Sequence, residues 1–385
     1  MSYAMRSVNA VLGQDLSVEL NLGPQALGLL TAAYLLTFAA MQLPLGIWLD
    51  KFGARRVETG LLLVAATGCG VFAVADSVGL LFMGRALIGA GASACLMGAL
   101  TSYRLWYPPA LQGRLASWML VAGISGSLAA TVPVRFFASQ TSWRMVFIAS
   151  AILLVLCAIG IWFTLPKALP EQSNSNAKKT SLLQIFKRQA LFATVPAAFV
   201  GQGGFLALQT LWAGPWMVQV LGVTPAQSAF YLLIMNLVLL LSYLLLGVVA
   251  PRMHVGAQRR FIFTALLTMS ASLIVAAIWR EPSAWIIWPI LAICSTGTMI
   301  LQSRVSVSMP REIAGRGNTA YNFVQFSGAF VIQWAFGAVA QLAIANGFET
   351  GTALGAGLAT LAVLQCLAAW WMWRNWREAK DFDTA

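Results

Sequence analysis

Long apolar segments alternate with short polar ones along almost the whole chain, which has 385 residues. Eleven of these segments are long enough to cross a hydrocarbon core of about 30 Å as a helix. The predicted spans are 27–48, 57–75, 79–106, 115–137, 144–165, 190–219, 228–249, 261–279, 285–309, 319–343 and 352–373. The pattern therefore predicts an all-α, polytopic membrane protein.

The segment before these spans is apolar but short. A helix over Met1–Gln14 would measure only about 20 Å, which is too short to cross a bilayer alone. Asp15 and Glu19 follow, and we expect them in an outer loop after a first helix. We therefore expect the chain to begin partway through that helix, through a truncation or a misassigned start codon.

Composition favours a lipid environment over water. Charged residues make up 9% of the chain and hydrophobic residues 59%, whereas about a quarter of a soluble domain is charged. The net charge of +12 is spread through short loops, whereas a nucleic-acid-binding protein would gather it on one soluble face. We expect the lipid bilayer as a partner and no nucleic acid.

The sequence offers little material for a metal centre or for catalysis. The five Cys lie in apolar segments without C-x-x-C spacing, and their odd number argues against a disulfide framework. His254 is the sole histidine. The chain contains no G-x-x-x-x-G-K-[ST] phosphate-binding loop and no nucleophile-base pair. We predict no cofactor, no metal and no enzymatic activity.

One sizeable polar stretch, at 166–189, divides the chain into two halves. The predicted parts are a helical bundle at 1–165, a linker at 166–189, a second bundle at 190–373 and a tail at 374–385. Most of the 24 Lys and Arg residues fall in loops on the linker's side of the membrane. The positive-inside rule then predicts a cytoplasmic linker and C-terminus in a cell inner membrane.

A cluster of charges and glycines separates the first two predicted spans. Its members are Gly46, Asp50, Lys51, Gly53, Arg55 and Arg56. The pattern resembles the loop between the second and third helices of the major facilitator superfamily. The resemblance implies two pseudo-symmetric six-helix bundles, here with a truncated first helix, and substrate bound near the bilayer midplane. It also implies that the cluster takes part in conformational change.

A weaker copy of this cluster follows in the second half, at Gly247, Pro251, Arg252, Arg259 and Arg260. The copy lacks the acid. The resemblance implies that Asp50 closes a charge-relay latch, so we expect a latch in the first half only.

Arg85, Gly89 and Gly91 resemble the fourth-helix motif of the same superfamily. An arginine within a span is costly, and it usually faces a wet cavity or a partner. One interpretation places Arg85 in the translocation path, in contact with an anion. The other has Arg85 hold helices together through backbone carbonyl groups.

Arg6 and Asn9 are three residues apart and therefore share one helix face. Arg6 is similar in placement to the first-helix arginine of superfamily members that carry organic phosphates and other anions. The competing interpretation is an arginine that extends to the outer membrane interface.

The twelve acidic residues are all expected in loops, tails or span ends, and none at mid-membrane. Proton symport and cation efflux usually need an intramembrane acid, so this pattern disfavours both. The fifth span also lacks the Gly-Pro pair of the drug-antiporter motif, which disfavours multidrug antiport.

The first span of the second half contains glycines and a proline that predict an interrupted helix, a favoured place for a substrate site. Candidate substrate-binding residues in the second half, beside Arg6, Asn9 and Arg85 in the first, are Gln202, Gln209, Trp212, Asn236, Asn322 and Gln325. Gln202 and Gln209 are seven residues apart and are predicted to share a face.

The sequence thus predicts a carrier that moves a small organic anion or a polar metabolite by alternating access and functions as a monomer. Two alternatives stay open: a drug or metabolite efflux carrier, and a non-transporting sensor built on a carrier fold.

Overall fold

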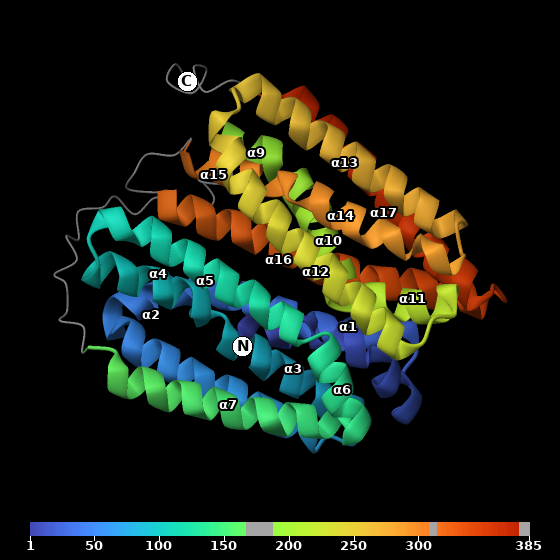
Figure 1. The fold of residues 1–385 in the computed structure, drawn as a ribbon, viewed down its shortest axis with the longest axis horizontal. Helices are drawn as coiled ribbons and strands as arrows, with labels where there is room; N and C mark the ends of the chain where they lie inside the picture. The colour runs from blue at the N-terminus through green and yellow to red at the C-terminus, as the bar shows by residue number, and fades with distance from the viewer. Residues whose placement is uncertain (167–187, 308–313, 377–385) are drawn as a thin grey trace. The chain divides into compact units, whose positions relative to one another are not determined.

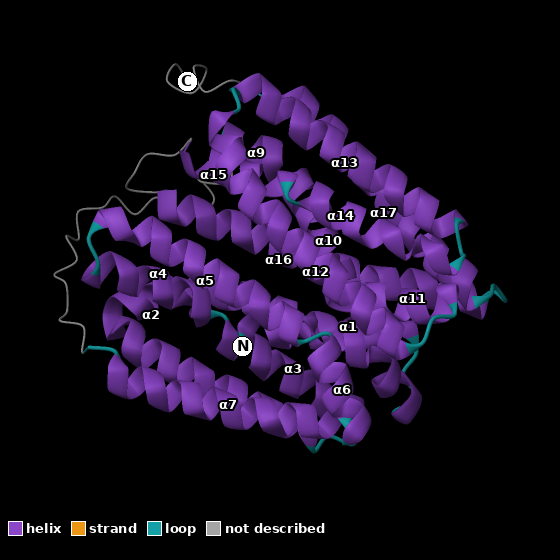
Figure 2. Cartoon of the chain, in the orientation of Figure 1, coloured by secondary structure: helices purple, strands orange, loops and turns teal. Residues whose placement is uncertain are grey.

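The computed structural model describes residues 1–166, 188–307 and 314–376, and in these ranges the regular elements are helices without a strand (Figure 2). Within them, 11 helices are long and apolar enough to cross a membrane. The prediction of an all-α polytopic chain is confirmed. Most of the predicted linker and of the C-terminal tail, at 167–187 and 377–385, lies outside the described residues.

The chain divides into two compact units, Met1–Ser175 and Asn176–Ala385. The helices of unit 1 are α1 (Ser2–Glu19), α2 (Pro24–Ala73), α3 (Val78–Ala92), α4 (Ala94–Trp106), α5 (Pro109–Ala129), α6 (Val132–Gln140) and α7 (Trp143–Thr164).

Helix α2 contains two membrane spans, Pro24–Gln42 and Lys51–Ala73. Gly53 breaks the helix between them, with φ 75° and ψ 156°. A side chain strongly disfavours this backbone conformation, so glycine suits the position. The charged turn predicted between the first two spans therefore lies at Gly53, where two helices meet at a kink.

Helices α2, α3 and α7 run side by side in unit 1 (Figure 1). Gly89 and Gly91 of α3 face the backbone of α2, where an added Cβ would collide with the carbonyl oxygens of Tyr34 and Leu61. Both glycines therefore allow the backbones of α2 and α3 to approach closely. Phe72 of α2 reaches α7, where its ring centroid lies 4.2 Å from that of Phe147.

Two predicted spans of unit 1 are each divided into two helices. The span predicted at 79–106 is divided at Ser93 into α3 and α4, and the Ser93 hydroxyl donates a hydrogen bond to the Ala90 carbonyl oxygen. The span predicted at 115–137 breaks at Thr131, which has φ −100° and ψ −110°. Hydropathy alone does not register these breaks, because the flanking residues remain apolar.

Helix α1 differs from the sequence prediction. Asp15 and Glu19 were expected in a loop, but both lie in the C-terminal part of α1. Arg135 and Arg144 form ion pairs with these two acids, which allows the helix to continue past the apolar segment. The predicted truncation of the first helix stays a prediction.

The helices of unit 2 are α9 (Gln189–Pro196), α10 (Gly203–Ala207), α11 (Ala213–Leu221), α12 (Pro225–Val249), α13 (Val255–Ile278), α14 (Ile287–Ser295), α15 (Gly297–Val307), α16 (Ala314–Ala345) and α17 (Thr350–Asn375). Two short 3₁₀ turns, η3 (Ala250–Arg252) and η4 (Pro282–Ile286), join neighbouring helices. The core around Leu266, Leu301 and Tyr321 is fully buried.

The predicted interruption of the first span in unit 2 takes another form. Residues Leu191–Leu221 make one helical span, and two π-helical turns, η1 (Ala197–Gln202) and η2 (Leu208–Trp212), lie within it. The chain therefore stays helical, and only the winding changes. Such π-helical turns occur frequently at functional sites.

Candidate functional site

Arg85 is completely buried in unit 1, with 0% of its surface exposed. Its Nη1 donates a hydrogen bond of 3.0 Å to the Met5 carbonyl oxygen, which ties α3 to α1. Nε and Nη2 have no hydrogen-bond partner among the described residues. In the described residues, the arginines that form ion pairs with acids are Arg135 and Arg144. The positive charge of Arg85 is therefore not neutralised by an acid from these residues.

Tyr34 of α2 contacts two arginines. The guanidinium carbon of Arg85 lies 5.4 Å from the centroid of the Tyr34 ring, and Arg6 interacts with the Tyr34 phenol group. The guanidinium carbon of Arg6 also lies 4.9 Å from the centroid of the Tyr3 ring and 5.2 Å from that of the Phe38 ring. Aromatic faces stabilise a cation without neutralising it, so this group of residues remains positively charged.

The first-half candidates occupy different depths around this arginine–tyrosine cluster, defined as Arg6, Tyr34 and Arg85. Arg6 is partly exposed, whereas Asn9 and Arg85 are buried. Asn9 Nδ2 donates a hydrogen bond of 3.0 Å to Thr31 Oγ1. A ligand that enters unit 1 can therefore reach Arg6 more easily than Arg85 or Asn9.

Unit 2 brings Gln209 and Asn236 together. Gln209 Nε2 donates a hydrogen bond of 2.8 Å to Asn236 Oδ1, and Asn236 Nδ2 donates one of 2.8 Å to the Leu232 carbonyl oxygen. Both side chains are buried. The pair joins η2 to α12 and holds its amides in a fixed orientation.

Gln202 faces a different helix from Gln209. Its Oε1 accepts a hydrogen bond from the hydroxyl of Thr298 in α15. Seven residues of regular α-helix would return almost to the same face. The residues between the two glutamines are mainly the α-helical turn α10 (Gly203–Ala207). The two side chains bond to different helices, α15 and α12, and the predicted shared face stays a prediction.

Asn322 of α16 is hydrogen-bonded to two further amide side chains. Its Oδ1 accepts hydrogen bonds from Gln302 Nε2 at 3.1 Å and from Gln325 Nε2 at 3.2 Å. Gln302 and Gln325 are partly exposed, so this amide cluster can offer donors and acceptors to a polar solute.

Contacts within the protein hold the indole of Trp212 in place. Its Nε1 donates a hydrogen bond of 3.1 Å to the Gln333 carbonyl oxygen, and its ring packs 4.7 Å from Phe336. Gln333 in turn donates a hydrogen bond to Thr210 Oγ1. These contacts join η2 to α16 and leave the indole fully buried.

The charged cluster near Gly53 is only partly described. Lys51 and Arg56 are exposed, and Arg55 lies with its guanidinium carbon 4.5 Å from the Trp162 ring of α7. The surroundings of Gly46 and the side chain of Asp50 are not among those that the structure describes. The predicted latch of Asp50 therefore stays a prediction.

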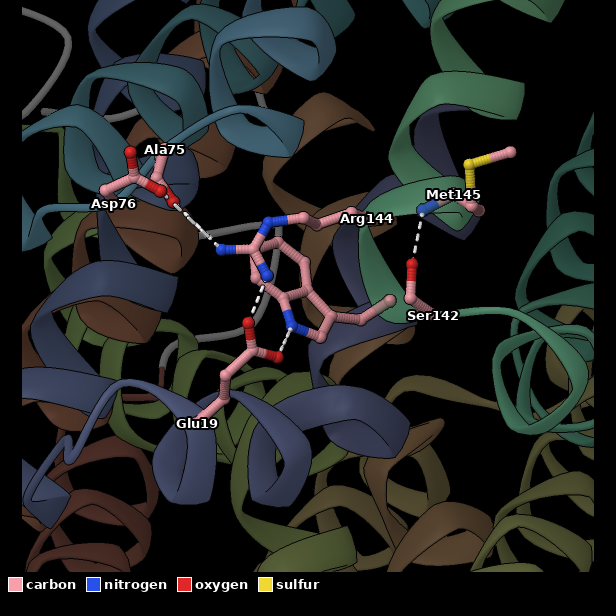
Figure 3. Close-up of polar contacts among 7 residues, drawn as sticks. Glu19, Ala75, Asp76, Ser142, Arg144 and Met145 are labelled. Atoms are coloured by element: carbon pink, nitrogen blue, oxygen red, sulfur yellow. Dashed lines mark hydrogen bonds and ion pairs between the residues drawn. The ribbon is translucent and has the colours of Figure 1, made fainter.

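A second charged group ties α1 to α6 and α7, and Figure 3 shows its part around Glu19 and Arg144. Glu19 accepts hydrogen bonds from Arg144 and from Trp143 Nε1, and Arg144 also reaches the Ala75 carbonyl oxygen and Asp76. The hydrogen bond from Arg144 is the main cause of a lowered pKa of Glu19, which Trp143 reinforces and partial burial opposes. Arg135 Nη1 binds Asp15 at 2.6 Å.

The expectation that every acid lies in a loop, a tail or a span end is wrong for Glu58. This residue lies within the span Lys51–Ala73, and 7% of it is exposed. The error arose because the span begins nearer to Gly53 than the apolar run indicated. Tyr34 and Thr298 were also missed, since single aromatic or hydroxyl residues in apolar runs carry no distinctive pattern.

No group of three or more His, Cys, Asp or Glu side chains that could hold a metal ion occurs in the part of the chain that the structure describes. The arrangement instead offers arginine and tyrosine in unit 1 and neutral amides in unit 2. Arginine forms strong hydrogen bonds with carboxylate groups, and amides both donate to and accept from hydroxyl groups.

Comparison with known proteins places these features in context. The model of the Major Facilitator Superfamily matches residues 1–333. A hexuronate transporter of Escherichia coli (strain K12) is 24% identical over 250 residues, which are 60% of this chain and 57% of that transporter. A galacturonate transporter of Dickeya chrysanthemi is 24% identical over 159 residues, or 41% of this chain and 46% of that one.

The fold also matches a solved structure over nearly its whole length. A bacterial homologue of the human lysosomal transporter Spinster, in an inward-facing and unoccupied conformation, aligns with a TM-score of 0.79 at 17% identity. The alignment covers 99% of this chain and 94% of that one. At this identity the match establishes the fold alone.

Proposed function

Because the chain belongs to the major facilitator superfamily, we propose that it is a secondary carrier for a small organic anion of the hexuronate class, working by alternating access. The observation that carries this proposal is the contact of both Arg6 and Arg85 with Tyr34. The two cations of the arginine–tyrosine cluster favour a cargo that carries a negative charge.

Arg6 is the residue that we expect to bind the cargo's carboxylate. It is partly exposed, and the rings of Tyr3 and Phe38 limit the directions that its side chain can take. A guanidinium group held in this way can form paired hydrogen bonds with a carboxylate at a low entropic cost. Selectivity for an acid over the corresponding neutral sugar would follow.

Arg85 has a different role in this proposal. Its complete burial keeps it from direct contact with a solute, while its hydrogen bond to Met5 fixes the backbone next to Arg6. Its positive charge in a low-dielectric environment still favours an anion nearby. We regard Arg85 as a positioning residue that also contributes electrostatically.

The hydroxyl groups of a sugar acid need uncharged partners. Taken by itself, unit 2 contains neutral amides in Gln302, Asn322 and Gln325, and in the Gln209–Asn236 pair. Neutral amides can bind hydroxyl groups without repelling the anion. Direct contact with a solute is proposed for the partly exposed Gln302 and Gln325, with support from Asn322.

The named relatives support the same substrate class. Both relatives are named as transporters of sugar acids, hexuronate in one and galacturonate in the other. The chain spans 57% and 46% of their lengths, so the substrate remains our proposal. We further propose an inner-membrane location with a cytoplasmic C-terminus, which fusions of alkaline phosphatase and a fluorescent protein to that end can test.

Uptake by reconstituted protein tests the function. Purified chain in liposomes should take up labelled D-galacturonate in a saturable way, and excess unlabelled D-galactose, the neutral sugar with the same ring, should compete weakly. Binding without uptake or counterflow would favour the sensor. Transport of a hydrophobic dye, with no transport of D-galacturonate or D-glucuronate, would favour an efflux carrier and contradict the proposal.

A further inference from the structure

Glu58 is an acid buried within the second span of α2. It lies about 10 Å along the helix from Lys51, the first residue of that span. Its Oε1 occupies the place that a Cβ at Gly98 of α4 would fill. The carboxylate therefore points at α4, and the absence of a side chain at Gly98 makes room for it.

A cavity of about 200 Å³ opens beside this carboxylate within unit 1. It is lined by Glu58, Leu62, Gly91, Ala94, Cys95, Ala99 and Ile161, which come from α2, α3, α4 and α7. Glu58 is its acidic group, and the other side chains are apolar except for the Cys95 thiol. An ionised carboxylate in such surroundings is costly unless it is paired.

No cation compensates Glu58 in the part of the chain that the structure describes. Neither a hydrogen bond nor an ion pair reaches its carboxylate there. Arg55, one turn earlier on the same helix, lies over the Trp162 ring. The titratable groups on the neighbouring helices are Cys95 and Tyr103 of α4, which interact electrostatically with Glu58. Cys157 of α7 and the Met1 α-amino group act on Cys95.

We propose that Glu58 is a proton-binding site that couples the movement of the anion to that of a proton. The carboxylate takes up one proton to become a neutral carboxylic acid on one side of the membrane, and releases it on the other. This inference rests on the proposed carrier function and adds its coupling ion. It also reverses the sequence-based argument against proton symport.

The chemistry of the cavity favours a proton over other cations. Metal ions such as Ca²⁺ require six to eight oxygen ligands, and the lining supplies one carboxylate. Pockets for drug-sized organic molecules are larger, at about 300–1,000 Å³. A proton needs only the carboxylate and enough room for the acid to lose its charge.

Charge balance gives this site a function. A hexuronate carries one negative charge, so its entry alone opposes a membrane potential that is negative inside, at about 2.3 kcal/mol per 100 mV. One proton bound at Glu58 cancels that charge. Transport of anion and proton together is then electrically neutral and driven by the proton concentration gradient.

Carbodiimide labelling tests the site independently of any substrate. Dicyclohexylcarbodiimide is apolar and reacts with protonated carboxyl groups, so the full chain in liposomes should be modified at Glu58 much more than at the ion-paired Glu19. Peptide mass spectrometry should show that this modification falls as the pH rises from about 6 to about 9. An unmodified Glu58, or labelling that is unchanged across this range, would overturn the proposal.

Transport measurements then test the coupling. In vesicles with an alkaline interior, the wild-type chain should accumulate labelled D-galacturonate above equilibrium. Glu58→Gln should still exchange D-galacturonate but should not accumulate it, while Glu58→Asp should retain part of the accumulation. Glu281→Gln, which alters an exposed acid of unit 2, is the matched control.

These two experiments fail in distinguishable ways. If the wild-type chain transports no D-galacturonate, the carrier proposal fails for this substrate, and the labelling still reports on the proton site. If Glu58→Gln accumulates D-galacturonate as the wild type does, the coupling role of Glu58 is wrong although the carrier proposal holds.

Discussion

Arg85 donates a hydrogen bond of 3.0 Å to the carbonyl oxygen of Met5, the residue that precedes Arg6. A buried cation of α3 thus holds the part of α1 that carries the more accessible arginine. This bond agrees with the interpretation in which Arg85 holds helices together through backbone carbonyl groups, while contact of Arg85 with an anion stays a prediction. The arrangement gives the two arginines different roles that mutation can separate.

Replacement of Arg85 should reduce transport through the position of Arg6. Arg85→Met removes the hydrogen bond to Met5 and should leave its carbonyl oxygen without this partner, at a cost of about 1–3 kcal/mol. Arg85→Lys keeps the charge but has a different shape, so partial activity is expected. Uptake of D-galacturonate and thermal melting in detergent measure both effects. Full activity in Arg85→Met would remove Arg85 from the site.

Replacement of Arg6 should weaken binding of the anion without unfolding the protein. Hydrogen bonds to charged groups contribute about 1.5–3 kcal/mol, so Arg6→Gln should raise KM for D-galacturonate roughly tenfold or more. Arg6→Lys should lie between Arg6→Gln and the wild type. An unchanged KM in Arg6→Gln would show that Arg6 does not contact the substrate.

The Glu19 and Arg144 ion pair should make stability depend on pH. Because the pKa of Glu19 is lower in the folded chain than its ordinary value of 4.5, the unfolded chain binds more protons in this range. Stability from this pair is therefore present above about pH 4.5 and declines as the pH falls through the folded pKa. The effect should be at most about 1 kcal/mol, because the pair is partly exposed.

Melting temperatures in detergent between about pH 7 and pH 3.5 measure this contribution. Glu19→Gln should lower stability at neutral pH and flatten the dependence on pH. Glu349→Gln, at the N-cap of α17 where the side chain makes no capping hydrogen bond, should leave the dependence as it is. Identical pH profiles for Glu19→Gln and the wild type would contradict the role of the pair.

Gly53 should tolerate a side chain poorly. Gly53→Ala places a Cβ on a backbone with φ 75° and ψ 156° and should lower the free energy of unfolding by about 1–3 kcal/mol. Gly60→Ala is the matched control on the same helix, since its Cβ would meet no atom within 4 Å. It should raise the free energy by up to about 1 kcal/mol. Equal melting shifts in the two variants would contradict this account.

Several features of the fold were predictable because they depend on local composition. Long apolar runs indicated the membrane spans, since hydrocarbon excludes charged and unpaired polar groups. Gly53 stood out as the glycine next to a charged turn, and Arg85, Gly89 and Gly91 stood out by their resemblance to the fourth-helix motif, to which the structure adds the close approach of both glycines to α2. Each of these signals lies within a few residues of sequence.

Other features depend on contacts between distant segments, which one sequence does not reveal. The burial of Glu58 follows from the position of Gly98 and α4, which lie far from it in the chain. Tyr34 joins Arg6 to Arg85 only because α1, α2 and α3 meet. Gln202 and Gln209 bond to different helices, α15 and α12, and only the packing of these distant helices shows which partner each glutamine meets.

Equilibrium binding of two labelled sugars tests the central claim most directly. D-galacturonate and D-galactose differ in the group that Arg6 is proposed to bind, so the ratio of their Kd values isolates its contribution. The wild-type chain should prefer D-galacturonate by about tenfold or more, and Arg6→Gln should lose this preference while its Kd for D-galactose stays the same. An equal Kd for both sugars in the wild type, or a preference that survives in Arg6→Gln, would contradict the account.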